Sequence, residues 1–341
     1  MPFEFYIKPL LIVYELDKMP IGFNEIARKM SNQSKPLSLI FNHKAGFRIQ
    51  GPEGIYEQLI DIFSAQGYQT KAYEINDSQQ FDKIMNEVLE QHLASSESGI
   101  IVAAGGDGTL NTVAKHVLNT QIPVGILPLG TFNYVARLLG IPLDLLEAAK
   151  VIATGQPQRM NVARINQEIY LNNASLGLYP LFIKKREDYN RIFGRLPLHA
   201  YTSALDVLIR DRKELKLKIW VDQKKYPVKT PLIFFGNNPL QLADMKMRIA
   251  EAAEKGKVAG VVVSKSDKLT LFKLVYQLIR GKIDQASDVY SFAADQVRIE
   301  SRAKKLMVAI DGEIVEMAPP LNISVLKDSL NVMVPHDPAS V

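Results

Sequence analysis

The stretch GIIVAA at residues 99–104 runs directly into GGDGT at residues 105–109. A short, continuous apolar run of this kind is typical of a strand that is buried on both faces of a parallel sheet. Beyond the glycines, apolar residues recur with helical spacing at Leu110, Val113 and Val117. The stretch therefore predicts a strand, a tight turn and an amphipathic helix in immediate succession.

The same rhythm extends on both sides of this unit. Strand-like segments at 37–42, 69–75 and 123–127 alternate with helical patterns at 51–67, 78–94 and 131–139. Alternation at this spacing predicts βαβ units and a parallel sheet.

After about residue 155 strands dominate, including 161–165 and 169–174, with helical stretches near 195–212 and 266–280. This change predicts a second, antiparallel domain. We therefore expect an N-terminal extension over 1–35, an α/β domain over 36–155 and a β-rich domain over 156–335.

The composition of the 341 residues narrows the functional classes. With 47% hydrophobic and 23% charged residues, the chain is typical of a soluble globular protein. The absence of cysteine excludes disulfides, thiolate metal sites and a cysteine nucleophile. The formal charge of +5 permits attraction to phosphate ligands or anionic membranes.

The GGDGT turn suits an anionic ligand. Its glycines let the backbone approach a ligand closely, and free N–H groups with the helix dipole favour negative charge at the helix start. A phosphate is the natural occupant. Because Asp107 would repel a bare phosphate, its presence suggests a bridging Mg²⁺ or a proton to be handled. The alternative is an ordinary turn that Asp107 or Thr109 caps.

A second such turn, PLGTFN at residues 128–133, follows the next strand. Successive parallel strands end at the same edge of a sheet, which is where ligands bind in open α/β folds. After the first strand, Asn42 and Lys44 could contact a nucleotide at that edge, or form a solvated surface turn. Asp311-Gly312-Glu313 by itself predicts a hairpin turn. It could contribute to the ligand site only if the second domain folds back over the first.

Several motifs are absent. The chain contains no P-loop, no G-x-G-x-x-G fingerprint and no G-x-S-x-G nucleophile elbow. Its basic residues are not interleaved with aromatic residues, so no nucleic-acid partner is expected.

In their order and spacing, these motifs resemble those of the diacylglycerol kinase catalytic-domain family, and in particular its stand-alone bacterial lipid kinases, related to the sphingosine and ceramide kinases. The resemblance covers about residues 36–335. It implies an α/β nucleotide-binding domain and a β-sandwich-like domain, with the active site in the cleft between them. ATP and Mg²⁺ are the implied cofactors.

The resemblance also assigns roles to residues. Glu313 matches the general base, and Asp107 sits in the Mg–phosphate network as a second catalytic residue and metal ligand. The ATP contacts that motif matching and position imply are Asn42, Lys44, Gly105, Gly106, Gly108, Thr109, Gly130, Thr131 and Asn133.

This sequence departs from the family pattern at several places, two of which concern metal binding. Tyr134 stands where many relatives have an aspartate of the metal network. The stretch 254–259, EKGKVA, has lysines where relatives place carboxylates that hold a structural Mg²⁺. Because hard cations need oxygen ligands, we predict that this structural metal is absent.

A lipid kinase must reach a bilayer. The stretch 265–282, KSDKLTLFKLVYQLIRGK, combines apolar and basic residues and could lie at a membrane surface; the alternative is a core helix with solvated lysines. We expect a cytoplasmic protein with peripheral contact at the inner membrane face. The oligomeric state cannot be read from the sequence.

The function expected is an ATP-dependent lipid kinase acting on diacylglycerol or a related lipid alcohol. Two alternatives stay open: an NAD kinase-like enzyme with a soluble substrate, and a non-catalytic nucleotide or lipid sensor.

Overall fold

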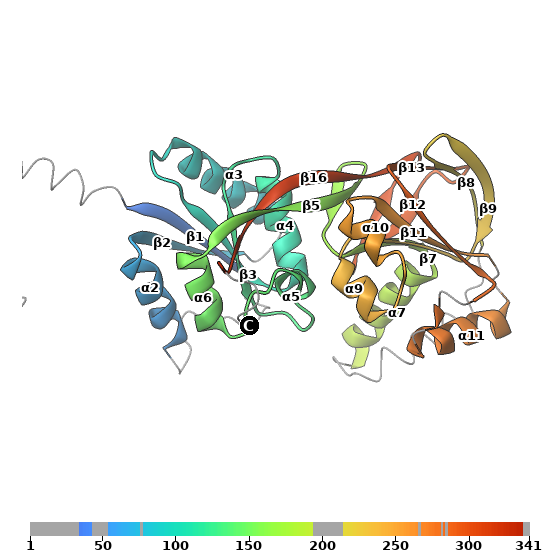
Figure 1. The fold of residues 1–341 in the computed structure, drawn as a ribbon, viewed down its shortest axis with the longest axis horizontal. Helices are drawn as coiled ribbons and strands as arrows, with labels where there is room; N and C mark the ends of the chain where they lie inside the picture. Colours follow the sequence, from blue (N-terminus) through green and yellow to red (C-terminus); the bar gives the residue numbers. More distant parts are fainter. Residues whose placement is uncertain are drawn as a thin grey trace, which may run out of the picture.

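A computed structural model describes residues 34–42, 54–75, 78–193, 214–264, 267–280, 282–283 and 286–336, and every structural statement below concerns these residues. Two units lie side by side along the long axis of the molecule (Figure 1). The predicted helix 195–212, Lys44 and residues 1–33 fall outside the described residues.

The first unit is the predicted α/β domain. Its strands β2, β1, β3 and β4 lie in that order and pair in parallel. Its elements are β1 (Lys35–Asn42), α2 (Ile55–Ala65), β2 (Tyr68–Ile75), α3 (Ser78–Ala94), β3 (Ile100–Gly105), α4 (Asp107–Val117), β4 (Val124–Pro128), α5 (Tyr134–Leu138) and α6 (Leu145–Thr154).

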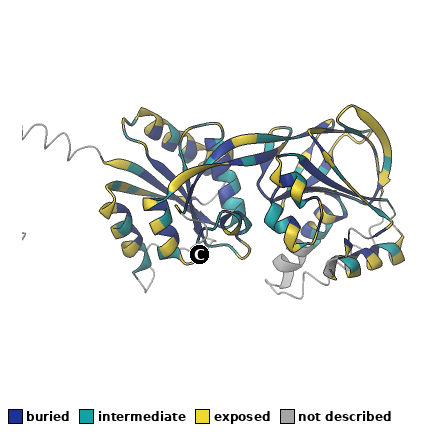
Figure 2. Cartoon of the chain, in the orientation of Figure 1, coloured by how far each residue is buried: buried dark blue, intermediate teal, exposed yellow. Residues whose placement is uncertain are grey.

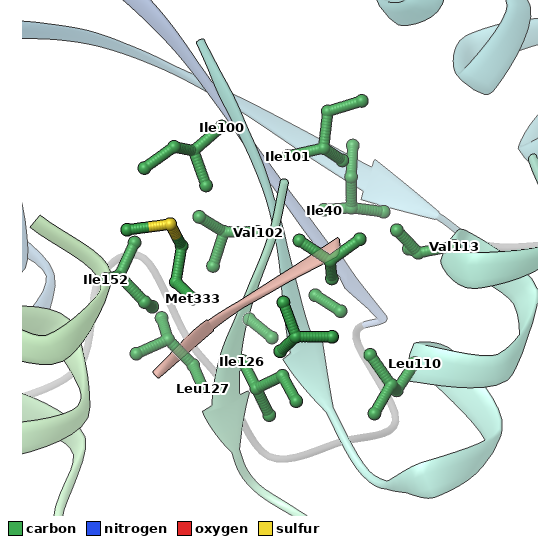
Figure 3. Close-up of a cluster of buried hydrophobic side chains, with 14 of the residues drawn as sticks. Ile40, Ile100, Ile101, Val102, Leu110, Val113, Ile126, Leu127, Ile152 and Met333 are labelled. Carbon is green, nitrogen blue, oxygen red and sulfur yellow. The ribbon is translucent and has the colours of Figure 1, made fainter. Parts of the chain in front are cut away.

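Burial explains why this sheet forms. All six residues of β3 are buried, as the continuous apolar run predicts. Leu110 and Val113 of α4 pack on one face of the strands, and Ile152 of α6 packs on the other (Figure 3). Full burial of each such aliphatic side chain contributes about 1.5–3 kcal/mol.

The second unit is the predicted antiparallel domain. It begins with β5 (Gln156–Ile165), β6 (Glu168–Tyr170), β7 (Asn173–Gly177), α7 (Leu178–Phe193), β8 (Leu215–Val221), β9 (Lys224–Thr230), β10 (Leu232–Gly236), α9 (Pro239–Asp244) and α10 (Ala250–Glu254). It continues with β11 (Val258–Val263), α11 (Lys268–Ile279), β12 (Val289–Ala294), β13 (Gln296–Ser301), β14 (Leu306–Ile310), β15 (Glu313–Met317) and β16 (Leu321–Val334).

Two sheets form the sandwich. One is wholly antiparallel, with the order β12-β11-β10-β7-β14-β15. It packs one face against β8, β13 and β16 through a core that includes Phe235, Val308 and Leu321. Helices cover its other face through a separate cluster that includes Leu242, Val261 and Leu274. The predicted class, an α/β domain followed by an antiparallel β-sandwich, is confirmed.

The two units share one sheet. The first residues of β16 pair with β13, and Val332 near its end pairs with β4. β5 pairs with β16 on both sides of the register shift between Leu326 and Leu330. Leu330, Val332 and Met333 therefore lie in the core of the first unit (Figure 3). The chain crosses between the units twice, once in β5 and once in β16. The expected division at residue 155 falls at the start of β5 and stays a prediction.

The prediction of a single strand over 169–174 is wrong. The segment is divided into β6 and β7 by Leu171 and Asn172. The backbone N–H groups of these two residues donate to the Asp311 carboxylate, so they are not available to a continuous strand ladder.

No helix among the described residues is both long and apolar enough to cross a membrane.

A buried polar pair lies beneath the first sheet. The Ser38 hydroxyl of β1 and Nε2 of His92 in α3 lie 2.9 Å apart, and both residues are buried. In the described part of the chain, His92 Nδ1 has no hydrogen-bond partner. Burial lowers the pKa of His92 below its ordinary value of 6.5.

This shift predicts acid sensitivity. The unfolded chain binds more protons at His92 than the folded chain does just below pH 6.5, so the stability contribution is present above that pH and is lost as the pH falls. The free energy of unfolding, measured with urea at a series of pH values, should fall less steeply towards low pH in His92→Gln than in the wild type. His116→Gln, at a less buried histidine, leaves the His92 contribution in place. The same pH dependence of the free energy of unfolding in wild type and His92→Gln would contradict the lowered pKa of His92.

Candidate active site

The GGDGT turn connects β3 to α4 as predicted. Gly106 precedes α4 with an extended backbone, and no side chain of the described residues caps the helix. Thr109 packs against Gly105, so the side chain that could serve as a cap turns back onto the strand end. The N–H groups of the first helical turn are thus open to an anionic ligand, which the helix dipole also favours.

The second turn lies directly against the first, as expected for turns at one sheet edge. The Leu129 N–H donates to the Gly105 carbonyl at 3.0 Å. A Cβ atom placed on Gly130 would lie only 2.5 Å from the Gly106 Cα. Glycine at 130 is therefore needed for the close approach of the two backbones. Thr131 and Phe132, at the tip of this turn, are exposed.

Asn133 holds the shape of the second turn. It is buried and has a positive φ of 48°. Its Oδ1 accepts a hydrogen bond from Gly130 N–H at 3.0 Å, and its Nδ2 donates to the carbonyls of Gly130 and Pro128. These bonds all stay within the turn, so the Asn133 side chain shapes the backbone of the turn, and its contact with a nucleotide stays a prediction.

Asp107 joins the two turns. Its carboxylate accepts hydrogen bonds from the N–H groups of Tyr134 at 3.2 Å and Val135 at 3.3 Å, at the start of α5. The residue that stands in place of a family aspartate, Tyr134, is thus tied to Asp107 by its backbone. The role of Asp107 in metal binding stays a prediction.

Asp311 and Gly312 form the predicted two-residue hairpin turn between β14 and β15. Ile310 pairs with Glu313 across it, and both turn residues have positive φ, 45° and 92°. Such a turn favours Asp-Gly because both positions require the left-handed region.

The Asp311 side chain does more than the sequence indicates. The residue as a whole is half-buried, and its carboxylate accepts hydrogen bonds from the N–H groups of Leu171, Asn172 and Asn173 at 2.8–2.9 Å. Asn111 of α4 donates to it at 2.6 Å. Burial raises the pKa of Asp311, and these donors act in the opposite direction. In the sequence, only the position of Asn111, directly after Leu110 and the GGDGT turn, indicates this contact between the units.

Glu313 reaches the first turn of α4. Its Oε1 lies 3.4 Å from the position that a Cβ atom would take on Gly108, and the residue is exposed. The structure therefore brings Glu313 of the second unit together with the glycine turn of the first. Asn42 ends β1, the strand next to β3; its side chain lies outside what the structure describes.

Another contact between the units is not predicted from the sequence. Arg137 of α5 donates to Asp244 of α9 at 3.3 Å. The Arg137 guanidinium lies over the Tyr134 ring, which stacks on Phe132 with centroids 5.8 Å apart. Neither partner is identifiable from local sequence, because Arg137 and Asp244 are 107 residues apart.

The lysine-containing stretch 254–259 lies away from these turns. Lys257 donates to Asp295 at 2.6 Å. This pairing, together with the charge of Lys327, lowers the pKa of Asp295. A lysine thus provides positive charge beside this loop, and the absence of a structural magnesium stays a prediction.

The fold and its two adjoining glycine turns define a two-domain protein of the α/β plus β-sandwich class. Residues 36–165 match the model of the diacylglycerol kinase catalytic domain, and residues 185–334 match the YegS C-terminal NAD kinase beta sandwich-like domain. The chain belongs to the diacylglycerol kinase catalytic-domain family.

Individual relatives agree. The chain is 27% identical over 307 residues to proteins named diacylglycerol kinase from Staphylococcus aureus strains RF122 and MRSA252, covering 89% of this chain and 93% of each relative. A diacylglycerol kinase structure from Bacillus anthracis is similar in fold, with a TM-score of 0.59 at 19% identity, over 90% of this chain and 98% of that one. A second structure from that organism gives a TM-score of 0.64 at 20% identity, over 90% and 99%.

The Asp311 contacts predict a large effect on stability. Asp311→Asn directs an amide at backbone N–H donors, and we expect it to lower the free energy of unfolding by about 3 kcal/mol. Asparagine tolerates positive φ, so the turn itself is not strained. Chemical denaturation measures the change.

Asp328→Asn is the matched control, because Asp328 also has a positive φ, 49°, but is exposed. It should change stability by no more than about 0.5 kcal/mol. Similar small effects at both positions would contradict a central role for Asp311.

Proposed function

We propose that the protein is an ATP-dependent lipid kinase that transfers the γ-phosphate to the hydroxyl of diacylglycerol or a related lipid alcohol. One observation carries the proposal: an exposed carboxylate, Glu313, stands beside Gly108 in the first turn of α4. A proton acceptor and an anion-binding helix start are thus side by side. Membership of the diacylglycerol kinase family supports the same chemistry.

The glycine turns would bind the nucleotide phosphates. Open N–H groups at the start of α4 would supply hydrogen bonds to them, and the positive end of the helix dipole favours their charge. The second turn, held by Asn133, would place Gly130 and Thr131 along the same ligand. Because phosphoryl transfer depends mainly on positioning and charge neutralisation, such a rigid frame suits it.

Glu313 would act as general base. As the lipid hydroxyl oxygen forms its bond to the γ-phosphorus, the bond to the β-phosphate oxygen breaks and ADP leaves. The hydroxyl proton passes to the Glu313 carboxylate. A positioned base typically contributes about 10²–10⁴-fold to the rate.

The residues present fit a magnesium ion that arrives with the nucleotide. Among the described residues no group of three or more acidic or histidine side chains forms a metal cage. Asp107 is the carboxylate of the glycine turn itself and would hold the ion, since Mg²⁺ is commonly held by one or two carboxylates together with substrate phosphates. When bound, the ion would neutralise charge on the phosphates.

Replacement of Glu313 tests the proposal. With labelled ATP and diacylglycerol in detergent micelles, Glu313→Gln should lower kcat by about 10²–10⁴-fold and leave nucleotide affinity within about twofold. Glu316→Gln is the matched control. Glu316 is on the same strand and is also exposed, but it pairs with Lys305 at 3.0 Å.

Three results would overturn the proposal. Label that moves to NAD instead of lipid would favour a soluble-substrate kinase. Nucleotide binding without turnover by folded wild-type protein would favour a sensor. Full activity in Glu313→Gln would remove its role as base.

Nucleotide binding can be tested separately from catalysis. Gly130→Ala would push the second turn away from Gly106, and we expect ATP affinity to fall by about tenfold, measured by calorimetry. Gly67→Ala introduces an alanine at positive φ far from the turns, with no atom within 4 Å of the new Cβ. An unchanged affinity in Gly130→Ala would argue against this turn as a phosphate site.

A further inference from the structure

Helix α11 presents two opposite apolar faces. Leu271 and Leu274 are buried in the cluster that covers the six-stranded sheet. On the other face, Leu269 is 83% exposed, Phe272 39% and Tyr276 59%. The prediction of a core helix thus accounts for one face only, and the exposed residues of α11 are visible in Figure 2.

The exposed residues form one continuous stripe. Positions 269, 272, 273, 276 and 280 follow spacings of three, four, seven and eleven residues, which bring them to the same side of a helix. Lys273 and Arg280 are exposed on this side. We call Leu269, Phe272, Lys273, Tyr276 and Arg280 the outer face of α11.

The charge of this region has one dominant sign. From residue 267 to 283 the sequence carries Lys268, Lys273, Arg280 and Lys282 against a single acidic residue, Asp267. The Arg280 guanidinium lies 5.6 Å from the centre of the Tyr276 ring, so an aromatic and a cationic group stand together on the outer face. Long basic side chains beside apolar ones can meet phosphates while the apolar groups enter a less polar layer.

We propose that the outer face of α11 docks on a bilayer that contains anionic phospholipid. An interfacial helix has this composition: leucine and aromatic side chains that enter the headgroup boundary, with basic residues that pair with lipid phosphates. Tyrosine is favoured at that depth because it has an apolar ring and a polar tip. The basic residues would suit either an anionic bilayer or an acidic protein. The exposed leucine favours the bilayer, because an acidic protein surface offers it no apolar layer to enter.

The position of α11 agrees with such docking. In Figure 1, α11 lies on the same long side of the molecule as α5, the helix that Asp107 caps. Contact through this side would bring the candidate active site towards the bilayer. The value of docking for catalysis rests on the proposed function, whereas the binding itself is measured without it.

A matched pair of double variants tests the proposal. Leu269→Gln with Lys273→Gln removes one exposed leucine and one exposed lysine from α11. Leu93→Gln with Lys83→Gln removes the same residue types from α3, where Leu93 is 69% exposed and Lys83 is also exposed. Binding is measured by co-sedimentation with phosphatidylcholine vesicles, with and without phosphatidylglycerol.

We expect the wild type and the α3 variant to bind the phosphatidylglycerol vesicles equally. The α11 variant should bind at least about tenfold more weakly. Added salt should weaken wild-type binding, because it screens the basic residues. Lys273→Glu, which leaves every apolar side chain in place, should weaken binding to anionic vesicles as well.

Other outcomes overturn the proposal. These are a wild type that does not sediment with anionic vesicles, equal loss in both double variants, or an α11 variant that binds normally. Self-association through α11 in gel filtration, without vesicle binding, would point to a second copy as the partner. Thermal unfolding checks that each variant is folded.

Kinase assays on diacylglycerol in micelles separate this proposal from the proposed function. If the wild type phosphorylates the lipid and the α11 variant still binds vesicles, the docking proposal is wrong and the proposed kinase activity is supported. If the α11 variant alone loses vesicle binding and no protein phosphorylates lipid, docking stands and the kinase fails.

Discussion

The geometry of the candidate active site depends on one desolvated carboxylate, that of Asp311. Burial of a charge is costly unless hydrogen bonds replace the lost water. Three consecutive N–H groups from residues 171–173 and the Asn111 amide meet that requirement. Because Asn111 belongs to the first unit and the three amides to the second, the bonds that solvate Asp311 also fix the hairpin that carries Glu313 against α4.

The polar side chains of the motifs are used largely to shape backbone. Asp107 accepts from the start of α5, and Asn133 bonds only to its own turn. What remains for a ligand is the set of N–H groups at the start of α4, with the exposed Glu313 opposite. A site of this kind is preorganised, since its donors are fixed before any ligand arrives. It also explains why glycine is needed where the turns touch, at Gly106 and Gly130.

Local patterns predicted most of the elements and the grouping of the turns. The helix expected over 78–94 has those bounds in the structure, and the strand expected over 99–104 is the wholly buried strand at 100–105, because periodicity and burial are local properties. Long-range pairing could not be predicted in the same way. The return of β16 to the first sheet and the break at Leu171–Asn172 depend on partners that lie far along the chain, β4 for the strand and Asp311 for the break. Periodicity carries no information about such partners.

These long-range contacts limit how the two units can move. They are joined by the β5–β16 ribbon and by side-chain contacts that include Asn111–Asp311, Lys115–Glu168 and Arg137–Asp244. The register of the ribbon shifts between Leu326 and Leu330, where Asp328 has a positive φ, so its ladder is interrupted at this one place. The Arg137–Asp244 pair is exposed and therefore weak. Any separation of the β14–β15 hairpin from α4 that goes beyond bending of the ribbon must break the Asn111–Asp311 bond and leave a desolvated carboxylate without one of its donors. The interaction that builds the site thus also resists its opening.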